Sequence, residues 1–359
     1  MAKIDVEWSK ATGYNEASKI RTFETRDIVK RLGAIAPFRV FINSHPIANP
    51  IAIFNPSFII RDGYLAEVYA RIIVGYYLYV SAIIRMEVPV SDILEGSVNI
   101  NYYSSEIVVY PSTKYDIWGC EDPRVYFINY SLYMTYAGRS VNYIHQPTAI
   151  ESVLPITAIG SAGGRRWSKL YVHVLNKGVR QRLIHDKDAF ILKLGGEYYF
   201  FHRPRLIGDT YYLVISKINL PTTCETKPCE VTPIETYDII PPASFELKIG
   251  WACPVLVEGS RVVLLVHGVD REIQAYRVFA VEVELGREVV VKAITPFYIM
   301  EPKTPYELYG DRPLTIFPSG SQVVDGKLIV SYGAADYMIG FGVIELSDLF
   351  TALDKGRLY

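Results

Sequence analysis

Charged and polar side chains recur at matching points of five apolar segments of the chain. One set stands just before the first apolar run of a segment, and the other stands at the end of the second run. The first set is Asn55, Asp122 with Arg124, and Lys187 with Asp188, and the second is Arg71, His202 with Arg203, His267 and Asp336. Burying such groups costs free energy unless they pair or bind a ligand. Together in one cavity they would suit a sugar or an anion, although single members could instead form salt bridges between segments.

The five segments form an internal repeat. Each contains a short motif, an apolar run, a tight turn and a second apolar run, and the motifs begin at residues 55, 122, 187, 253 and 317. Asp-Gly and Gly-Gly between apolar runs are typical of β-hairpins. Five hairpins at near-constant spacing predict an all-β fold, a five-bladed β-propeller, better than a sandwich or a β-helix. Because a hairpin reverses direction, its first strand starts at the rim where its second strand ends, so the polar residues should ring one mouth of the axial channel.

The pattern changes before the first repeat. Ile20, Phe23, Ile28 and Leu32, with charged residues between them, predict an amphipathic helix over residues 15–33 that ends at Gly33. We therefore expect an N-terminal helical extension over residues 1–40 and a five-bladed propeller as the catalytic domain over residues 41–359. The helix would either pack on the propeller or form a contact in a homo-oligomer.

Composition excludes several classes of protein. The 359 residues carry a formal net charge of −1, which gives no electrostatic reason to expect nucleic acid or an anionic membrane as a partner. We find neither an apolar run long enough to span a membrane nor the apolar core of a signal peptide, so we expect a cytoplasmic protein. Scarce glutamine with abundant tyrosine, isoleucine and valine favours a thermophile. Cys224 and Cys229 could pair or remain free thiols, and no cysteine or histidine spacing indicates a metal site.

Several motifs resemble those of glycoside hydrolase family 130, the mannoside phosphorylases and mannosidases. The segment Gly119-Cys120-Glu121-Asp122-Pro123-Arg124, followed by Met134-Thr135-Tyr136, is similar to the family signature G-x-E-D-P-R … Y-x-T-Y. Further matching motifs follow in the family's order from about residue 45 to residue 350: Phe54-Asn55-Pro56, His202-Arg203-Pro204, Val266-His267-Gly268, Tyr306-Glu307, Phe317-Pro318 and Tyr332-Gly333-Ala334-Ala335-Asp336.

This resemblance implies a five-bladed propeller and a single essential acid, Asp122, which protonates the departing glycosidic oxygen while a nucleophile attacks with inversion. It implies that the mannosyl unit is held by Asn55, Arg71, Arg124 and Asp336, and that phosphate is bound by Arg203 and His267. We add Lys187 and Asp188 to the substrate-binding residues because they stand at the start of the third repeat.

The identity of the nucleophile is less clear from the sequence. An inverting hydrolase needs a base opposite its acid, whereas a phosphorylase needs cations that bind phosphate. Family phosphorylases commonly read P-P-I-K-T where this chain has Cys253-Pro254-Val255-Leu256-Val257, so Leu256 stands at the expected lysine and weakens the case for phosphate. After Gly310, a replacement cation could come from Arg312 or a base from Asp311.

We therefore predict inverting phosphorolysis of β-mannosides, which converts a mannoside and phosphate to α-mannose 1-phosphate and a shortened acceptor. Inorganic phosphate would be a co-substrate, and no cofactor is expected. The alternatives are an inverting β-mannoside hydrolase that uses the same site, and a carbohydrate-binding propeller without catalysis.

Overall fold

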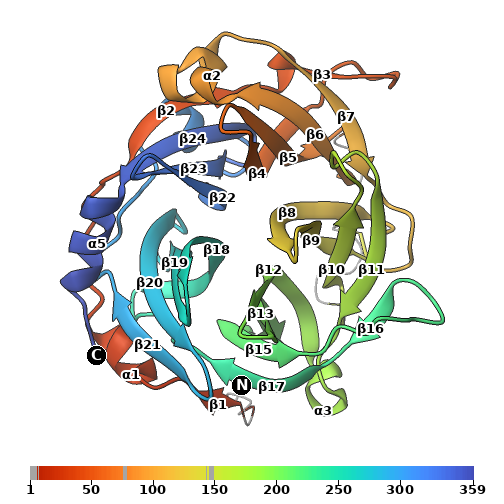
Figure 1. Ribbon diagram of the computed structural model, residues 1–359. Helices are drawn as coiled ribbons and strands as arrows, with labels where there is room; N and C mark the ends of the chain where they lie inside the picture. The colour runs from red at the N-terminus through yellow and green to blue at the C-terminus, as the bar shows by residue number, and fades with distance from the viewer. Residues whose placement is uncertain (1–5, 7, 76–78, 143, 145–148) are drawn as a thin grey trace.

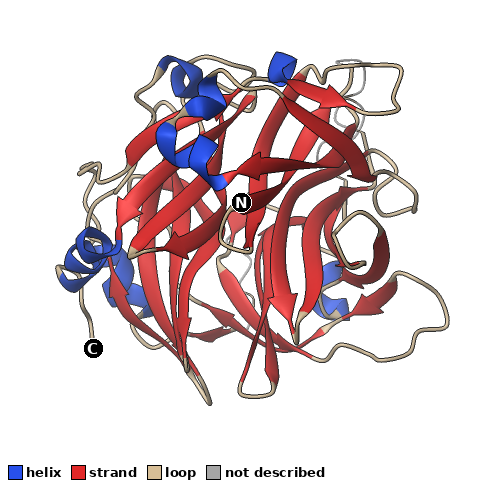
Figure 2. Ribbon diagram, turned by 45° about the horizontal axis from the view of Figure 1, so that its top comes forward, coloured by secondary structure: helices blue, strands red, loops and turns tan. Residues whose placement is uncertain are grey.

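The computed structural model describes residues 6, 8–75, 79–142, 144 and 149–359. Strands make up most of its regular structure, and they form five antiparallel four-stranded groups arranged in a ring (Figure 1). The predicted predominance of β structure is confirmed. The short helices lie on the outside of the strands (Figure 2). No helix among the described residues is both long and apolar enough to cross a membrane.

The groups follow one another along the chain. The first group contains β4 (Ala52–Arg61), β5 (Leu65–Ile73), β6 (Ser81–Pro89) and β7 (Tyr103–Val109). The second contains β8 (Gly119–Ile128), β9 (Ser131–Arg139), β10 (Val153–Gly160) and β11 (Trp167–His173). The third contains β12 (Leu183–Leu194), β13 (Glu197–Leu206), β15 (Val214–Ile218) and β17 (Pro233–Asp238).

The fourth group contains β18 (Glu246–Glu258), β19 (Arg261–Asp270), β20 (Tyr276–Leu285) and β21 (Val289–Ile294). The fifth contains β22 (Ile316–Val324), β23 (Lys327–Ala334), β24 (Met338–Glu345) and, from the start of the chain, β2 (Lys30–Ile35). Short parallel bridges from β6 to β8 and from β10 to β12 connect the first three groups.

The chain also contains shorter strands, helices and 3₁₀ turns outside these five groups. The short strands are β1 (Ser9–Lys10), β3 (Val40–Ile42), β14 (Thr210–Tyr211) and β16 (Cys229–Val231). The helices are α1 (Tyr14–Lys19), α2 (Val90–Glu95), α3 (Lys177–Arg180), α4 (Pro305–Leu308) and α5 (Leu346–Asp354), with 3₁₀ turns at Pro37–Arg39 and Ser97–Asn99. Cys224 and Cys229 form a disulfide.

The apolar core lies between adjacent groups. The largest cluster joins the third and fourth groups, where Phe201 and Trp251 pack with their rings 5.3 Å apart. Separate clusters lie between the fourth and fifth, the fifth and first, and the first and second groups. Each sheet therefore buries both faces against its neighbours, which fits the apolar runs on which the repeat was recognised.

The prediction of a helix over residues 15–33 is wrong beyond Lys19. The helix α1 ends there, and Gly33 lies within β2, opposite Phe341 of β24. The apolar residues that suggested one helical face pack instead into three different clusters, since Ile20, Ile28 and Leu32 each contact another one. Residues 30–35 thus complete the fifth group, so the proposed extension over residues 1–40 is not separate from the sheets at this point.

Candidate active site

Three inner strands carry the same local distortion at the predicted motifs. The pairing of β4 with β5, of β8 with β9 and of β12 with β13 shifts by one residue at a bulge. The bulged residues Asn55, Asp122 and Asp188 have positive φ angles of 49°, 53° and 55°. Asparagine and aspartate tolerate this left-handed region better than most residues, and a bulge redirects the side chain. The repeat thereby brings an amide and two carboxylates to one place.

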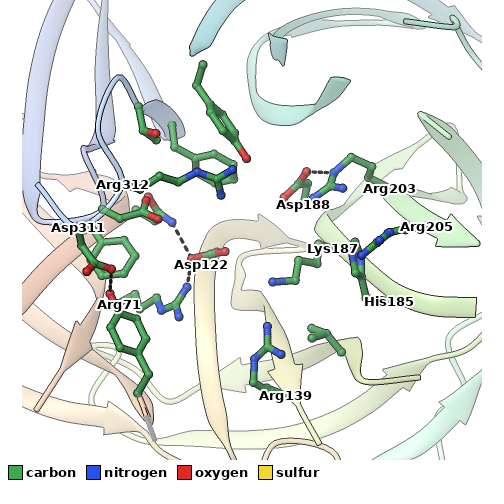
Figure 3. A pocket seen from close by; sticks show the side chains of 18 of the residues that line it. Arg71, Asp122, Arg139, His185, Lys187, Asp188, Arg203, Arg205, Asp311 and Arg312 are labelled. Carbon is green, nitrogen blue, oxygen red and sulfur yellow. Dashed lines mark hydrogen bonds and ion pairs between the residues drawn. The ribbon is translucent and has the colours of Figure 1, made fainter. Parts of the chain in front are cut away.

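These side chains face a cavity of about 690 Å³. Seven of the nine predicted site residues line it: Asn55, Arg71, Asp122, Lys187, Asp188, Arg203 and Asp336. Figure 3 shows Asp122 beside Arg71, Asp311 and Arg312, and across the cavity from Asp188 and Arg203. Arg124 and His267 do not belong to the lining.

Two side chains of the first strand group hold Asp122 in position. Its Oδ1 accepts hydrogen bonds from Asn55 Nδ2 at 2.7 Å and from the Arg71 guanidinium at 3.2 Å. Within the described part of the chain, its Oδ2 makes no hydrogen bond to protein, so this oxygen can reach a substrate. The side chain is 10% exposed, and the carboxyl is therefore both accessible and fixed in position.

Glu121 lies next to Asp122 in the chain and contacts three cations. Its carboxylate is fully buried and contacts Arg139 at 2.7 Å, Lys187 at 2.9 Å and Arg71 at 3.4 Å. Burial alone would raise the pKa of Glu121, but these three cations hold it well below its usual range. Its fixed negative charge keeps three positive side chains at the cavity wall, because breaking a buried ion pair is costly.

Asp188 is paired on the opposite wall. The Nε of Arg203 donates a hydrogen bond to its Oδ2, and both side chains are buried. Burial alone would raise the pKa of Asp188, but the charge of Arg203 keeps it below its usual range. Asp188 is therefore ionised, neutralised and poorly suited to accept a proton from water.

Asp336, the last predicted carboxylate, lies on the side of Asp122. Burial raises the pKa of Asp336 to about 6, although Arg71 and Arg312 oppose this shift. The neighbouring Asp311 accepts a hydrogen bond from the phenol of Tyr79. Both carboxylates thus share the cavity wall that carries Asp122.

Arg124 supports the backbone instead of lining the cavity. It donates to the carbonyl oxygens of Ala252 at 2.8 Å and of Asp122 at 3.1 Å. It therefore ties the second inner strand to the fourth from behind the acid. A direct contact of Arg124 with the sugar is not supported by this placement.

His267 lies behind Asp188, with 3.5 Å between its Nε2 and Asp188 Oδ2. It packs against the rings of Tyr276 and Phe317. Burial lowers the pKa of His267 to about 3, so the imidazole is neutral at pH 7 and does not supply the expected positive charge for phosphate.

His202 also points away from the cavity. Its Nδ1 lies 2.7 Å from Asp186 Oδ2, and its Nε2 lies 2.8 Å from Ser216 Oγ. Although this order resembles a hydrolytic triad, all three side chains are buried, and Ser216 also bonds Thr236. The arrangement therefore holds strands of the third sheet together and has no access to a substrate.

Sequence reasoning missed several residues of the lining, namely Tyr79, Arg139, His185, Arg205, Lys248 and Tyr276. Arg139 could have been found, because it ends β9 as Arg71 nearly ends β5. Lys248 precedes the fourth motif, where no repeat pattern pointed to it. Arg312 and Asp311 do line the cavity, as their proposed replacement roles require.

Comparisons with known proteins identify the family of this chain. The sequence profile of glycoside hydrolase family 130, described as β-1,4-mannooligosaccharide phosphorylase, matches residues 19–355. The chain belongs to glycoside hydrolase family 130. As a member of family 130, it is an enzyme of the glycoside phosphorylase or glycoside hydrolase type, which confirms the predicted class.

Two family 130 relatives come from Thermoanaerobacter sp. (strain X514). A β-1,2-mannobiose phosphorylase is 27% identical over 262 residues, which are 70% of this chain and 74% of the relative. A 1,2-β-oligomannan phosphorylase is 26% identical over 301 residues, which are 83% of this chain and 91% of the relative. The solved β-1,2-mannobiose phosphorylase from Listeria innocua has the same fold, with a TM-score of 0.65 at 18% identity over 89% of this chain and 97% of that one.

At Leu256 this family 130 chain lacks the lysine of the family motif, but Leu256 does not line the cavity. Leu256 packs at the edge of the apolar cluster between the fourth and fifth groups. It lies eight residues beyond Lys248 on β18, or about 25 Å along an extended strand. Leu256 is therefore a packing residue outside the cavity lining, so the lack of a lysine at this position does not remove a charge from the cavity.

Proposed function

We propose that this protein is an inverting phosphorylase that acts on β-mannosides, with Asp122 as its general acid and a five-bladed β-propeller as its scaffold. The five strand groups in a ring support the scaffold. The names of the two Thermoanaerobacter relatives support β-1,2-linked mannosides as the substrate class. The observation that carries the proposal is that Asp122 faces a wall of cations whose one carboxylate, Asp188, is already neutralised.

The mannosyl unit is expected on the side of Asp122. Asn55, Arg71 and Asp336 line the cavity there and offer an amide, a guanidinium and a carboxyl to sugar hydroxyl groups. Asn55 and Arg71 also bind the acid, so substrate contacts and the orientation of Asp122 depend on the same side chains.

The reaction exchanges one bond for another at the anomeric carbon. A phosphate oxygen forms a bond to C1 as the bond from C1 to the glycosidic oxygen breaks. The proton of Asp122 moves to the departing oxygen, which leaves as a hydroxyl group of the acceptor. Attack on the opposite face inverts the configuration and gives α-mannose 1-phosphate, and Asp122 regains its proton from solvent.

Phosphate is favoured over water because this site has cations where an inverting hydrolase needs a base. Opposite Asp122, Asp188 is bound to Arg203, whereas Asp311 and Asp336 lie on the side of the acid. Phosphate is already an anionic nucleophile and needs positive charge for binding, which Arg139, Lys187 and Arg203 supply at the lining.

The test is turnover of β-1,2-mannobiose with and without inorganic phosphate, followed by ¹H and ³¹P NMR. We expect α-mannose 1-phosphate and free mannose in equal amounts, and no turnover without phosphate. Release of mannose alone in phosphate-free buffer would show a hydrolase. Binding of mannosides without turnover under either condition would favour the non-catalytic alternative.

A further inference from the structure

A second cavity lies on the outer part of the first group, and we call it the outer cavity. Its volume is about 300 Å³, and it is lined by residues of β6 and β7 and by Arg165, which lies between β10 and β11. β7 lies at the outside of the ring, three strand spacings or about 14 Å from the inner strand β4 (Figure 1). None of its lining residues lines the cavity of Asp122, so the two cavities are separate.

The outer cavity leaves one polar sheet face open. Arg85 of β6 lies opposite Glu106 of β7, and Glu87 and Ser104 share this face because alternate residues of a strand point the same way. Met86 points to the other face and is buried in the apolar cluster between the fifth and first groups. Elsewhere both sheet faces pack against neighbouring groups, whereas these polar side chains border a space that a ligand can enter.

Arg85 fixes two carboxylates at the wall of the outer cavity. This arginine is buried, with its Nη2 at 2.8 Å from Glu87 Oε1 and its Nη1 at 3.7 Å from Glu106 Oε1. Among the described residues, neither Glu87 Oε2 nor Glu106 Oε2 makes a hydrogen bond to protein. Two acceptor oxygens are thus held in position and available to hydroxyl groups.

Hydrogen-bond donors lie beside these acceptors. Ser104 Oγ donates to Asn43 Oδ1 at 2.9 Å, and within the described ranges of the chain Asn43 Nδ2 donates to no protein atom. Arg165 contacts Glu106 with one nitrogen, at 3.4 Å, while most of its side chain is exposed. The amide and the guanidinium can therefore donate hydrogen bonds to a ligand that also reaches the carboxylates.

The ring of Tyr102 forms an apolar edge of the outer cavity. Its centroid lies 5.8 Å from that of Phe41 and 5.3 Å from the Arg39 guanidinium, and these contacts orient the ring. Tyr102 is nevertheless 60% exposed. An oriented and accessible aromatic ring can pack against an apolar patch of C–H groups on a ligand.

The charges of the outer cavity are balanced. Its lining has two arginines, Arg85 and Arg165, and two glutamates, Glu87 and Glu106. Glu67, which lies behind them, pairs with Arg85 at 2.6 Å and with Arg61 at 2.8 Å. An anion or a cation would gain no net attraction here. Paired donors and acceptors beside one aromatic ring suit a neutral ligand with several hydroxyl groups, which is the chemistry of a sugar.

We propose that the outer cavity is a second carbohydrate site, which binds mannosyl units of an oligosaccharide at Tyr102, Glu87, Glu106, Asn43 and Arg165. The choice of mannosyl units rests on the proposed function, whereas the choice of a neutral sugar rests on the lining. The site holds a long chain on the protein, and turnover of mannobiose at Asp122 does not require it.

The experiment measures binding of β-1,2-mannohexaose to the full chain by isothermal titration calorimetry, in an Asp122→Asn background that does not turn over. We expect two binding events in this parent. Tyr102→Ala and Glu106→Gln should each weaken one event by about tenfold or more, through loss of an aromatic contact or of a charged acceptor, and leave the other unchanged. Hydrogen exchange should show protection by the hexaose at residues 102–106 and 161–165 in the parent only.

Matched controls use exposed residues away from the outer cavity. Tyr130→Ala, in the turn after β8, and Glu95→Gln, at the end of α2, should bind the hexaose like the parent. With Asp122 intact, Tyr102→Ala and Glu106→Gln should keep the wild-type kcat on mannobiose, which shows that both variants fold.

A single binding event in the parent, or equal affinities of the parent, Tyr102→Ala and Glu106→Gln for both events, would overturn the proposal. Equal affinity of the outer cavity for cellohexaose would overturn the assignment of mannosyl units. Failure of the proposed function would appear separately, as wild-type turnover of mannobiose without phosphate, because binding at the outer cavity is measured without turnover.

Discussion

Arg71 forms an ion pair with Asp122 at 3.2 Å, and it does so across two sheets, since Arg71 lies on β5 of the first group and Asp122 on β8 of the second. The same guanidinium reaches Glu121 at 3.4 Å. The position of the acid therefore depends on the packing of neighbouring sheets as well as on its own bulge. A substitution of Arg71 should therefore change the orientation of Asp122 more than it changes the stability of the fold.

We predict that Arg71→Met lowers kcat on β-mannobiose by about 10²-fold, because a small displacement of a catalytic group costs about this much. Steady-state kinetics would measure the effect. The matched control is Arg165→Met, since Arg165 is 65% exposed and pairs with Glu106, which is 37% exposed. Equal loss in both variants would contradict a specific role for Arg71.

Glu121→Gln should destabilise the fold by about 3–5 kcal/mol, because it removes the buried carboxylate that Arg71, Arg139 and Lys187 share. Urea unfolding at pH 7 would measure this change. Glu235→Gln removes a carboxylate that is 41% exposed and pairs with Lys217, so its effect should stay below about 1 kcal/mol. A Glu121 variant as stable as this control would show that the buried charge is unimportant.

Asp336→Asn should raise stability at pH 7–8. Burial raises the folded-state pKa of Asp336 to about 6, which is above its value in the unfolded chain. The contribution of this carboxyl to the stability of the folded protein is therefore lost as pH rises from about 4 through 6. The shift of about two units corresponds to about 3 kcal/mol at pH 7.5, and the difference should vanish near pH 4.

Unfolding across this pH range compares Asp336→Asn with Asp325→Asn, a change in an exposed turn. The control should show no pH-dependent gain. A constant difference between the Asp336 variant and the wild type at all pH values would show that the carboxyl does not titrate in this range.

Leu256→Lys tests the register of β18. If Leu256 packs outside the cavity, a lysine there should leave the KM for phosphate unchanged and cost about 1 kcal/mol of stability, because it places a charge at an apolar cluster. Phosphate kinetics and urea unfolding would report the two effects. A clearly lower KM for phosphate would place residue 256 at the phosphate site.

The place of the acid could be predicted because it depends on a local pattern. Hairpin turns recur at near-constant spacing, and a bulge within each of three inner strands turns Asn55, Asp122 and Asp188 into the cavity. The resemblance to family 130 then indicated Asp122 as the carboxyl that we propose to be the acid. These signals lie within a few residues of one another, so the sequence alone carries them.

The support around the acid could not be predicted in the same way. Arg124 and His267 occupy positions that the motifs emphasise, yet strand alternation and bulges turn them behind the cavity wall. Lys248 and Arg312 reach the cavity only because three sheets converge there. The prediction of a long N-terminal helix was wrong for a related reason, since Ile20, Ile28 and Leu32 are partly buried and pack against separate clusters that only the tertiary structure reveals.

The role of Asp122 is tested most directly by comparing Asp122→Asn with the wild type on two substrates at saturating phosphate. β-1,2-Mannobiose has a leaving group that must be protonated, whereas 2,4-dinitrophenyl β-mannoside has one that leaves without a proton. We predict that the variant loses about 10³-fold in kcat on mannobiose and retains most of its activity on the aryl mannoside, with α-mannose 1-phosphate as the product. An equal loss on both substrates, or no loss on mannobiose, would contradict the assignment of Asp122 as the general acid.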